Sequence, residues 1–154
     1  MKKILLVLFL ILGVVSFALP NYVSEEKIRN SGYEITDEEE FGFRIARQKN
    51  NGDATVVLYY LDYPEVSSAK QLSEMSVKTA PEEFKFLGST ENKKAYINKF
   101  VSPEGKGVYS FVGKKSKIKN CYIVIMHSTS KQLSNSELTK TVDVLLDEAE
   151  SFLK

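Results

Sequence analysis

The sequence predicts an α+β domain in which helices pack on an antiparallel β-sheet, and three observations lead to this expectation. Short runs rich in β-branched and aromatic residues follow one another with brief turns between them. A long amphipathic helix is expected from Ser134 onward. No repeat, low-complexity block or Pro/Gly-rich linker divides the chain, so residues 33–154 are expected to form a single domain.

The first 20 residues, MKKILLVLFLILGVVSFALP, have the layout of a secretory signal peptide. Two lysines precede an uncharged apolar run, and Ser16 and Ala18 flank Phe17 in the small-x-small pattern of a cleavage site. We therefore expect residues 1–18 to be removed after Ala18 and the protein to be exported, to the periplasm or the cell exterior. The alternative is a retained membrane anchor, which would need roughly 20 apolar residues, whereas this run ends before Pro20.

The amino-acid composition bears on three properties: nucleic-acid binding, disulfide formation and attachment as a lipoprotein. Loss of Lys2 and Lys3 with the signal peptide lowers the number of Lys and Arg from 21 to 19, against 20 Asp and Glu. This balance argues against nucleic-acid binding, which calls for a basic excess. The single cysteine, Cys121, excludes an intramolecular disulfide, and it lies too far from Ala18 to be the acylated residue of a lipoprotein.

The first part of the mature chain is expected to hold one short helix and a hairpin. Residues 19–32 form a polar N-terminal segment, with a short helix at residues 24–30. Period-two alternation in FGFRIARQK, with Phe43 and Ile45 on one side, predicts a half-buried strand. The turn at residues 50–53 then leads into ATVVLYYLDYP, which completes the hairpin.

A helix and a series of strands are expected next. In SSAKQLSEMSVKTAP, apolar residues fall near helical spacing, Ser68 is a plausible N-cap and Pro81 lies beyond the end. Three to four strand-like runs follow: EFKFLGST, KKAYINKFVS, GVYSFVGKK and NCYIVIMHST. Turn signals separate them at residues 91–93, 103–107 and 114–119. Short turns between sequential strands imply antiparallel pairing.

The C-terminal helix has the clearest pattern in the chain. Ser134 and Glu137 match a capping box at its start. Apolar residues then recur on one face, namely Leu138, Val142, Leu145, Leu146, Ala149, Phe152 and Leu153. A helix of this kind must lie on a sheet or on a partner.

The stretch CYIVIMHST contains the only cysteine and the only histidine of the chain. Its apolar residues occupy both faces of the expected strand, which indicates a central strand covered on each side. Cys121 and His127 would then lie on the order of 20 Å apart, too far for a thiol–imidazole pair. We expect Cys121 to be a buried core residue, whereas His127 could still meet a distant carboxylate.

No metal or cofactor site is expected. The sequence has no HExxH, paired CxxC or GxSxG motif, and its one P-loop-like spacing lacks the Ser or Thr that would bind magnesium. Consecutive carboxylates at residues 37–40 do not have the spacing of a calcium loop, so they are expected to form a solvated edge.

Two surface features remain as candidate binding residues. Lys114, Lys115, Lys117 and Lys119 fall on an expected hairpin tip, where they would meet an anionic membrane or a phosphate-rich polymer, or simply keep the turn soluble. Tyr59, Tyr60 and Tyr63 gather at a strand end, with Tyr60 on the opposite face from the other two. Such tyrosines suit a half-wet binding surface, although they are also ordinary strand residues.

The order of hairpin, helix, antiparallel strands and long C-terminal helix resembles the PsbP-like fold. The similar segments are the strand end YLDYP, the hairpin GSTENKKAYINKF, the strand CYIVIM and the closing AESFLK, within residues 33–154. This resemblance implies an α/β/α sandwich that docks onto larger partners, often membrane-associated complexes, without doing chemistry itself. It carries over no catalytic or binding residues.

These observations favour an exported, non-enzymatic domain that binds a protein or another component of the cell envelope. The candidate surfaces are the sheet edge, the tyrosines and the lysine-rich tip. One alternative is a small apolar ligand held in a pocket between sheet and helix. A second is a hydrolase that uses His127.

Overall fold

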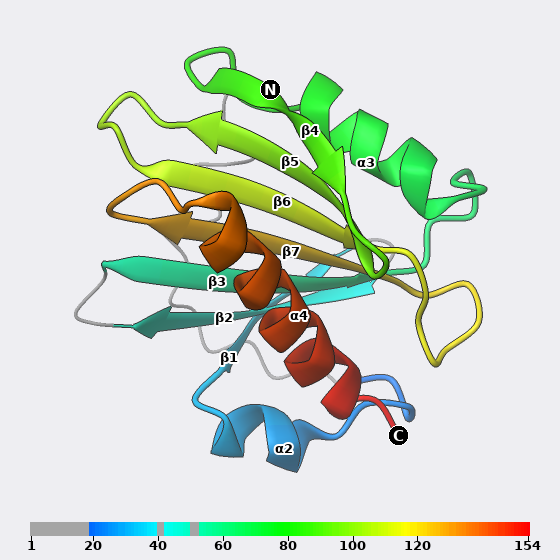
Figure 1. The fold of residues 1–154 in the computed structure, drawn as a ribbon. Coiled ribbons are helices and arrows are strands. Elements are labelled where there is room, and N and C mark those ends of the chain that lie inside the picture. Colours follow the sequence, from blue (N-terminus) through cyan, green and yellow to red (C-terminus); the bar gives the residue numbers. More distant parts are fainter. Residues whose placement is uncertain (1–18, 40–41, 50–52) are drawn as a thin grey trace.

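The structure is a computed structural model that describes residues 19–39, 42–49 and 53–154. The expected signal peptide, residues 1–18, lies outside the described residues. So do residues 40–41, which include the last residue of the acidic stretch, and residues 50–52 of the first turn. The described part contains three helices and one seven-stranded antiparallel sheet, so the predicted α+β architecture is confirmed (Figure 1).

The elements lie where the sequence pattern indicated. The helices are α2 (Glu25–Asn30), α3 (Ala69–Lys78) and α4 (Asn135–Ser151). The strands are β1 (Glu34–Glu39), β2 (Gly42–Lys49), β3 (Ala54–Leu61), β4 (Lys85–Glu91), β5 (Ala95–Val101), β6 (Gly107–Gly113) and β7 (Tyr122–Thr129). Among them, β1 is the strand that the sequence analysis did not identify.

The strand order is β1-β2-β3-β7-β6-β5-β4, with every neighbouring pair antiparallel. Strands β4 to β7 follow one another as a meander, and β7 then pairs with β3 along its whole length. The central position predicted for the CYIVIMHST strand is therefore confirmed.

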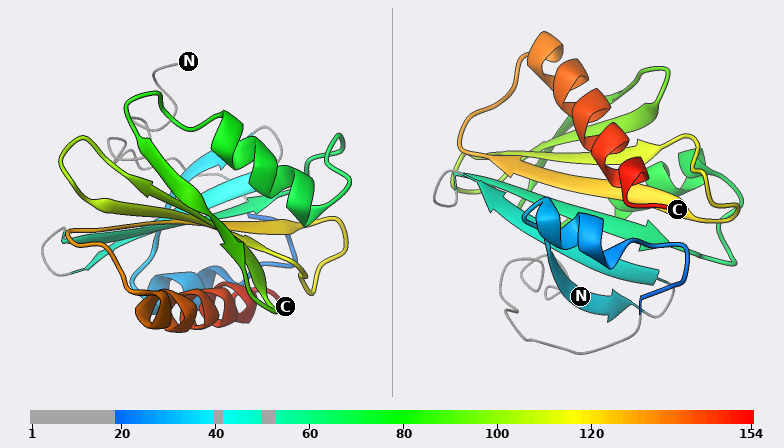
Figure 2. Two further views of the ribbon diagram at one scale, coloured as in Figure 1. Left: turned by 45° about the horizontal axis from the view of Figure 1, so that its top comes forward. Right: turned by 90° about the horizontal axis from the view of Figure 1, so that it is seen from below.

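Helices cover both faces of this sheet. Figure 2 shows α3 on one face and α2 with α4 on the other. Helix α4 begins with the predicted capping box, in which the Glu137 N–H donates to Ser134 Oγ and the Ser134 N–H donates to Glu137 Oε2. Each apolar residue predicted to lie on its inner face is buried: Leu138, Val142, Leu145, Leu146, Ala149, Phe152 and Leu153.

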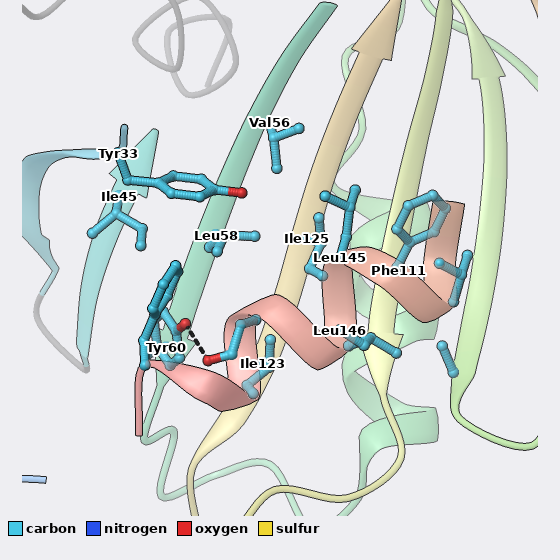
Figure 3. Close-up of a cluster of buried hydrophobic side chains, with 14 of the residues drawn as sticks. Tyr33, Ile45, Val56, Leu58, Tyr60, Phe111, Ile123, Ile125, Leu145 and Leu146 are labelled. Atoms are coloured by element: carbon cyan, nitrogen blue, oxygen red, sulfur yellow. Dashed lines mark hydrogen bonds between the residues drawn. The ribbon is translucent and has the colours of Figure 1, made fainter. Parts of the chain in front are cut away.

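The core beneath α4 is the larger of two hydrophobic clusters (Figure 3). Tyr60 is fully buried there, stacked on Phe43 with ring centroids 4.7 Å apart. Its hydroxyl donates to the Ala149 carbonyl at 2.7 Å, which satisfies both the phenol and the last turn of α4. Burial raises the pKa of Tyr60 well above its ordinary value, so the phenol remains a hydrogen-bond donor.

A charged network ties α4 to β2. Arg47 meets Glu148 in a bidentate pair with N–O distances of 2.7 and 2.8 Å, and it also donates to the Ser31 carbonyl after α2. The Tyr33 hydroxyl donates to Glu148 at 2.8 Å, and the Arg47 guanidinium lies 4.2 Å from the centroid of the Tyr33 ring. One ion pair thus joins a strand, the C-terminal helix and the N-terminal segment.

Helix α3 packs on the other face with fewer apolar residues. Ala69 and Leu72 are its buried hydrophobic contacts, next to a polar contact at Ser73. Asn98 of β5 is almost fully buried beneath it and donates to both Ser73 oxygens, at 3.0 and 3.1 Å, while Ser89 Oγ donates to Asn98 Oδ1. These hydrogen bonds orient α3 on the sheet, where few apolar side chains of the helix are buried.

Irregularities in the ladder occur at both edges of the sheet. The register shifts between Ile35 and Asp37 in β1, and between Phe86 and Gly88 in β4. In contrast, the inner pairs β2–β3, β3–β7, β5–β6 and β6–β7 run in continuous register along their described residues. Strand β4 is also largely exposed, including Phe86 at 45% and Leu87 at 44% of their surface.

The Arg47–Glu148 pair should be a main source of stability. In Glu148→Gln, the guanidinium of Arg47 keeps its largely buried position without a carboxylate partner, so the free energy of unfolding should fall by about 2–3 kcal/mol. Urea unfolding checks this value. Asp143→Asn on the same helix is the matched control and should change stability by less than about 0.5 kcal/mol; equal losses in both variants would contradict the role given to the pair.

Candidate functional site

A cluster of lysines lies at one end of the sheet. Alternate strands of a meander end on the same side, so the turn after β4 and the turn after β6 meet there (Figure 1). The Lys114 N–H donates to the Lys94 carbonyl at 2.8 Å and joins the two turns directly. The C-terminal half of α4 lies against both turns, since Lys94 Nζ donates to Asp147 Oδ1 at 2.9 Å and the Lys117 N–H donates to Glu150 Oε2 at 3.2 Å.

These three elements enclose a shallow hollow of about 140 Å³. Its lining residues are Lys93, Lys94, Lys114, Lys115, Leu146, Asp147 and Glu150. Pockets for small organic ligands are usually larger, on the order of 300 Å³ or more. The hollow therefore suits one compact group, such as a phosphate or a carboxylate.

Two of the four lining lysines have acidic partners. Lys94 Nζ lies 2.9 Å from Asp147 Oδ1, and this hydrogen bond raises the pKa of the lysine. Lys114 pairs with Glu91, whose pKa is lowered chiefly by that hydrogen bond. The Lys114 ammonium also lies 4.7 Å from the centroid of the Tyr96 ring, on the α3 face of the sheet.

The other lysines of this end have no such partner. Within the described part of the chain, no ion pair reaches the ammonium groups of Lys93, Lys115, Lys117 or Lys119. Six lysines thus face four carboxylates, those of Glu91, Asp143, Asp147 and Glu150, and the end carries a net charge of about +2. Ammonium groups offer hydrogen-bond donors only, so the site is suited to anions. We call these six lysines the lysine end.

The sequence analysis identified only part of this site. Lys114, Lys115, Lys117 and Lys119 do lie in the turn after β6, as predicted. Lys93 and Lys94 were missed, although a turn was expected at residues 91–93. Strand order was the missing information, because only the meander brings the two turns together.

The predicted tyrosine cluster divides between the two faces of the sheet. Tyr59 and Tyr63 are partly buried against the smaller cluster beneath α3, and they are joined there by Tyr96 and Tyr122. Tyr60 points the other way into the core under α4, so it is not part of an accessible surface. The α3-side tyrosines lie at the same end of the sheet as the lysines, since Tyr96 pairs with Glu91 in the ladder.

The only cysteine and histidine lie in structural surroundings. Cys121 is buried directly before β7 as a free thiol, and burial raises the pKa of that thiol to about 11. His127 is 9% exposed, with Nδ1 3.2 Å from the Thr55 carbonyl oxygen. Its ring lies 6.3 Å from that of Tyr109 and 6.5 Å from that of Phe111, and burial lowers its pKa.

Two further observations concern metal ligands and helix length in the described ranges. No group of three or more His, Cys, Asp or Glu residues in them is placed to bind a metal ion. None of the helices α2, α3 and α4 has the length and apolar character needed to cross a membrane.

Comparison with known proteins found no match by family model or by sequence to curated proteins.

His127→Phe tests the pH dependence that a buried histidine confers. Burial lowers the pKa of His127 in the native protein below 6.5. Between the native and the unfolded pKa, the unfolded chain therefore binds a proton while the native histidine stays neutral. Its contribution to stability is therefore complete above about pH 6.5 and is lost as the pH falls through the lower native pKa. The variant should show a flatter profile of unfolding free energy between about pH 7 and pH 5, measured by urea titration.

Carboxylates do not interfere with that comparison. Hydrogen bonds lower the pKa values of Glu91, Glu104 and Glu137, so the stability that these groups add is lost only as the pH falls below about 4.5. A wild-type profile as flat as that of the variant would show that His127 titrates alike in the folded and unfolded chains.

Proposed function

We propose that this protein is an exported, non-enzymatic binding domain that docks through the lysine end onto an anionic component of the cell envelope. The observation that carries the proposal is the hollow in which Lys93, Lys94, Lys114 and Lys115 converge from two turns. Bringing ammonium groups together costs electrostatic energy that an anionic partner relieves. A soluble surface with no ligand would gain more from spreading these charges apart.

The surroundings of the reactive side chains favour binding over catalysis. His127 directs Nδ1 toward a backbone carbonyl, and Cys121 has a pKa of about 11. A general base needs a pKa near the working pH, and a nucleophilic thiol needs a lowered one. Both residues have properties of core side chains.

Packing between the sheet and α4 also favours docking over a ligand pocket in the interior. The inner-face residues of α4 and the facing residues of β3 and β7 are buried in one cluster (Figure 3). The hollow lies at the surface, beside that cluster. A partner would therefore meet the lysine end from outside.

The partial resemblance in fold agrees with this function. The helices on both faces of the antiparallel sheet, and the long C-terminal helix, support the proposal of a PsbP-like sandwich. Proteins of that fold dock onto larger, often membrane-associated assemblies, so the same mode of action is proposed for this chain.

Neutralising the unpaired lysines should weaken binding to anions in general. We expect the quadruple variant K93Q/K115Q/K117Q/K119Q to bind inorganic polyphosphate and polyglutamate at least about tenfold more weakly than the wild type at low salt, because four attractive charges are lost. Fluorescence anisotropy with labelled polymers measures this affinity.

The matched control removes four lysines from other surfaces. K78Q/K85Q/K106Q/K140Q changes the net charge by the same amount, and each of these side chains is exposed away from the hollow. It should retain affinity within about threefold, if position and not total charge decides binding. If both variants lost affinity equally, total charge and not the position of the lysines would decide binding, which would contradict the proposed site.

Export predicts a defined mature N-terminus. When the full chain is expressed in a bacterial host, the secreted or periplasmic product should begin at Leu19, because Ser16 and Ala18 provide the small side chains of the cleavage site. Intact-mass measurement checks this directly. Ala18→Arg should block processing and leave a longer, membrane-associated product, whereas the conservative Ala18→Ser should be processed. A full-length product in the cytoplasm would contradict export.

A further inference from the structure

We infer that the anionic partner is a lipid bilayer with anionic headgroups, on which the chain docks with the lysine end facing the headgroup plane. This inference rests on the proposed function and names the partner of the same site. Bilayers present many negative charges in one plane, within reach of basic segments at the surface.

The number of lysines exceeds what one bound anion would use. A hollow of about 140 Å³ has room for one compact group, and it is lined by only four of the six lysines. Lys117 and Lys119 belong to the same turn but not to the lining of the hollow. Lys94 and Lys114 already pair with Asp147 and Glu91, so a partner has to satisfy the remaining four, Lys93, Lys115, Lys117 and Lys119. Such a partner must offer several anions side by side, as headgroups do.

The choice of residue also favours a fluid surface. All six basic residues of the site are lysines, whereas the three arginines of the chain, Arg29, Arg44 and Arg47, lie elsewhere. The planar guanidinium suits fixed, bidentate recognition of one carboxylate or phosphate. Lysine is a point charge on a flexible stem, which adapts to headgroups that move in the plane of a membrane.

Contact is expected at the level of the headgroups, without insertion into the acyl region. The large exposed hydrophobic residues of the described chain are Met75, Phe86, Leu87 and Val144, and none of them lies in the two lysine-bearing turns. Ile118, within the second turn, is partly buried against the main core. Binding should therefore depend on charge and weaken steeply with salt.

An acidic protein segment fits the geometry less well. Extended segments usually bind along an open strand edge, and the lysine end presents turns. A membrane can engage Lys93, Lys115, Lys117 and Lys119 from outside without entering the hollow.

Vesicle flotation with the mature chain tests this inference. Vesicles of phosphatidylcholine containing about one third phosphatidylglycerol should bind the wild type, whereas pure phosphatidylcholine vesicles should not. Because each lysine near such a surface contributes about fivefold in partitioning, K93Q/K115Q/K117Q/K119Q should bind more than about 100-fold more weakly. The control K78Q/K85Q/K106Q/K140Q should stay within a few fold of wild type. Raising the salt to about 0.5 M should release the wild type.

The outcomes separate this inference from the proposed function. If the wild type binds polyglutamate or polyphosphate at the lysine end but not the anionic vesicles, the bilayer is excluded as partner and anion binding survives. If it binds none of the three, both proposals fail. Equal binding of the lysine variant and its control to vesicles would also overturn the inference. Circular dichroism of each variant confirms that it is folded.

Discussion

The bidentate pair between Arg47 and Glu148 fixes the orientation on which the rest of the structure depends. Together with the buried apolar face of the helix, it sets the rotation of α4 about its axis, with Glu148 facing β2. At 100 degrees per residue, Asp147 and Glu150 then fall on the opposite flank of the helix, about 60 degrees apart, where the lysine-bearing turns lie. A partly buried ion pair thereby helps to position two carboxylates of a surface site.

Charge at the lysine end arises from topology and not from composition. The chain has nearly equal numbers of acidic and basic residues, a composition that disfavours a strongly basic binding protein. The meander nevertheless collects lysines from residues 93–94 and 114–119 at one end. A balanced composition thus leaves room for a strong local field, which only the fold reveals.

Much of the fold could be predicted because its signals are local. Period-two runs, the Ser68 cap and the Ser134–Glu137 capping box each depend on a few neighbouring residues, and the structure confirms the elements that they indicated. Strand β1 was missed because its acidic residues mask the alternation. The face occupied by Tyr60 was predictable as opposite to Tyr59, but which face α4 covers depends on long-range packing. Arg47 follows Phe43 and Ile45 in the period-two alternation of the strand, so its side chain lies on the same face of the sheet as these two core residues. The alternation therefore also indicates that Arg47 faces α4, which was not predicted.

The shifts of register in β1 and β4 have a consequence for the behaviour of the protein at high concentration. An outer strand with regular spacing offers its unpaired backbone groups as a template for fibril growth. Here the template is interrupted at Ile35–Asp37 on one side and at Phe86–Gly88 on the other, next to the exposed Phe86 and Leu87. An incoming chain would lose alignment at each interruption, so the sheet can display apolar side chains at its rim and still resist polymerisation in a crowded compartment.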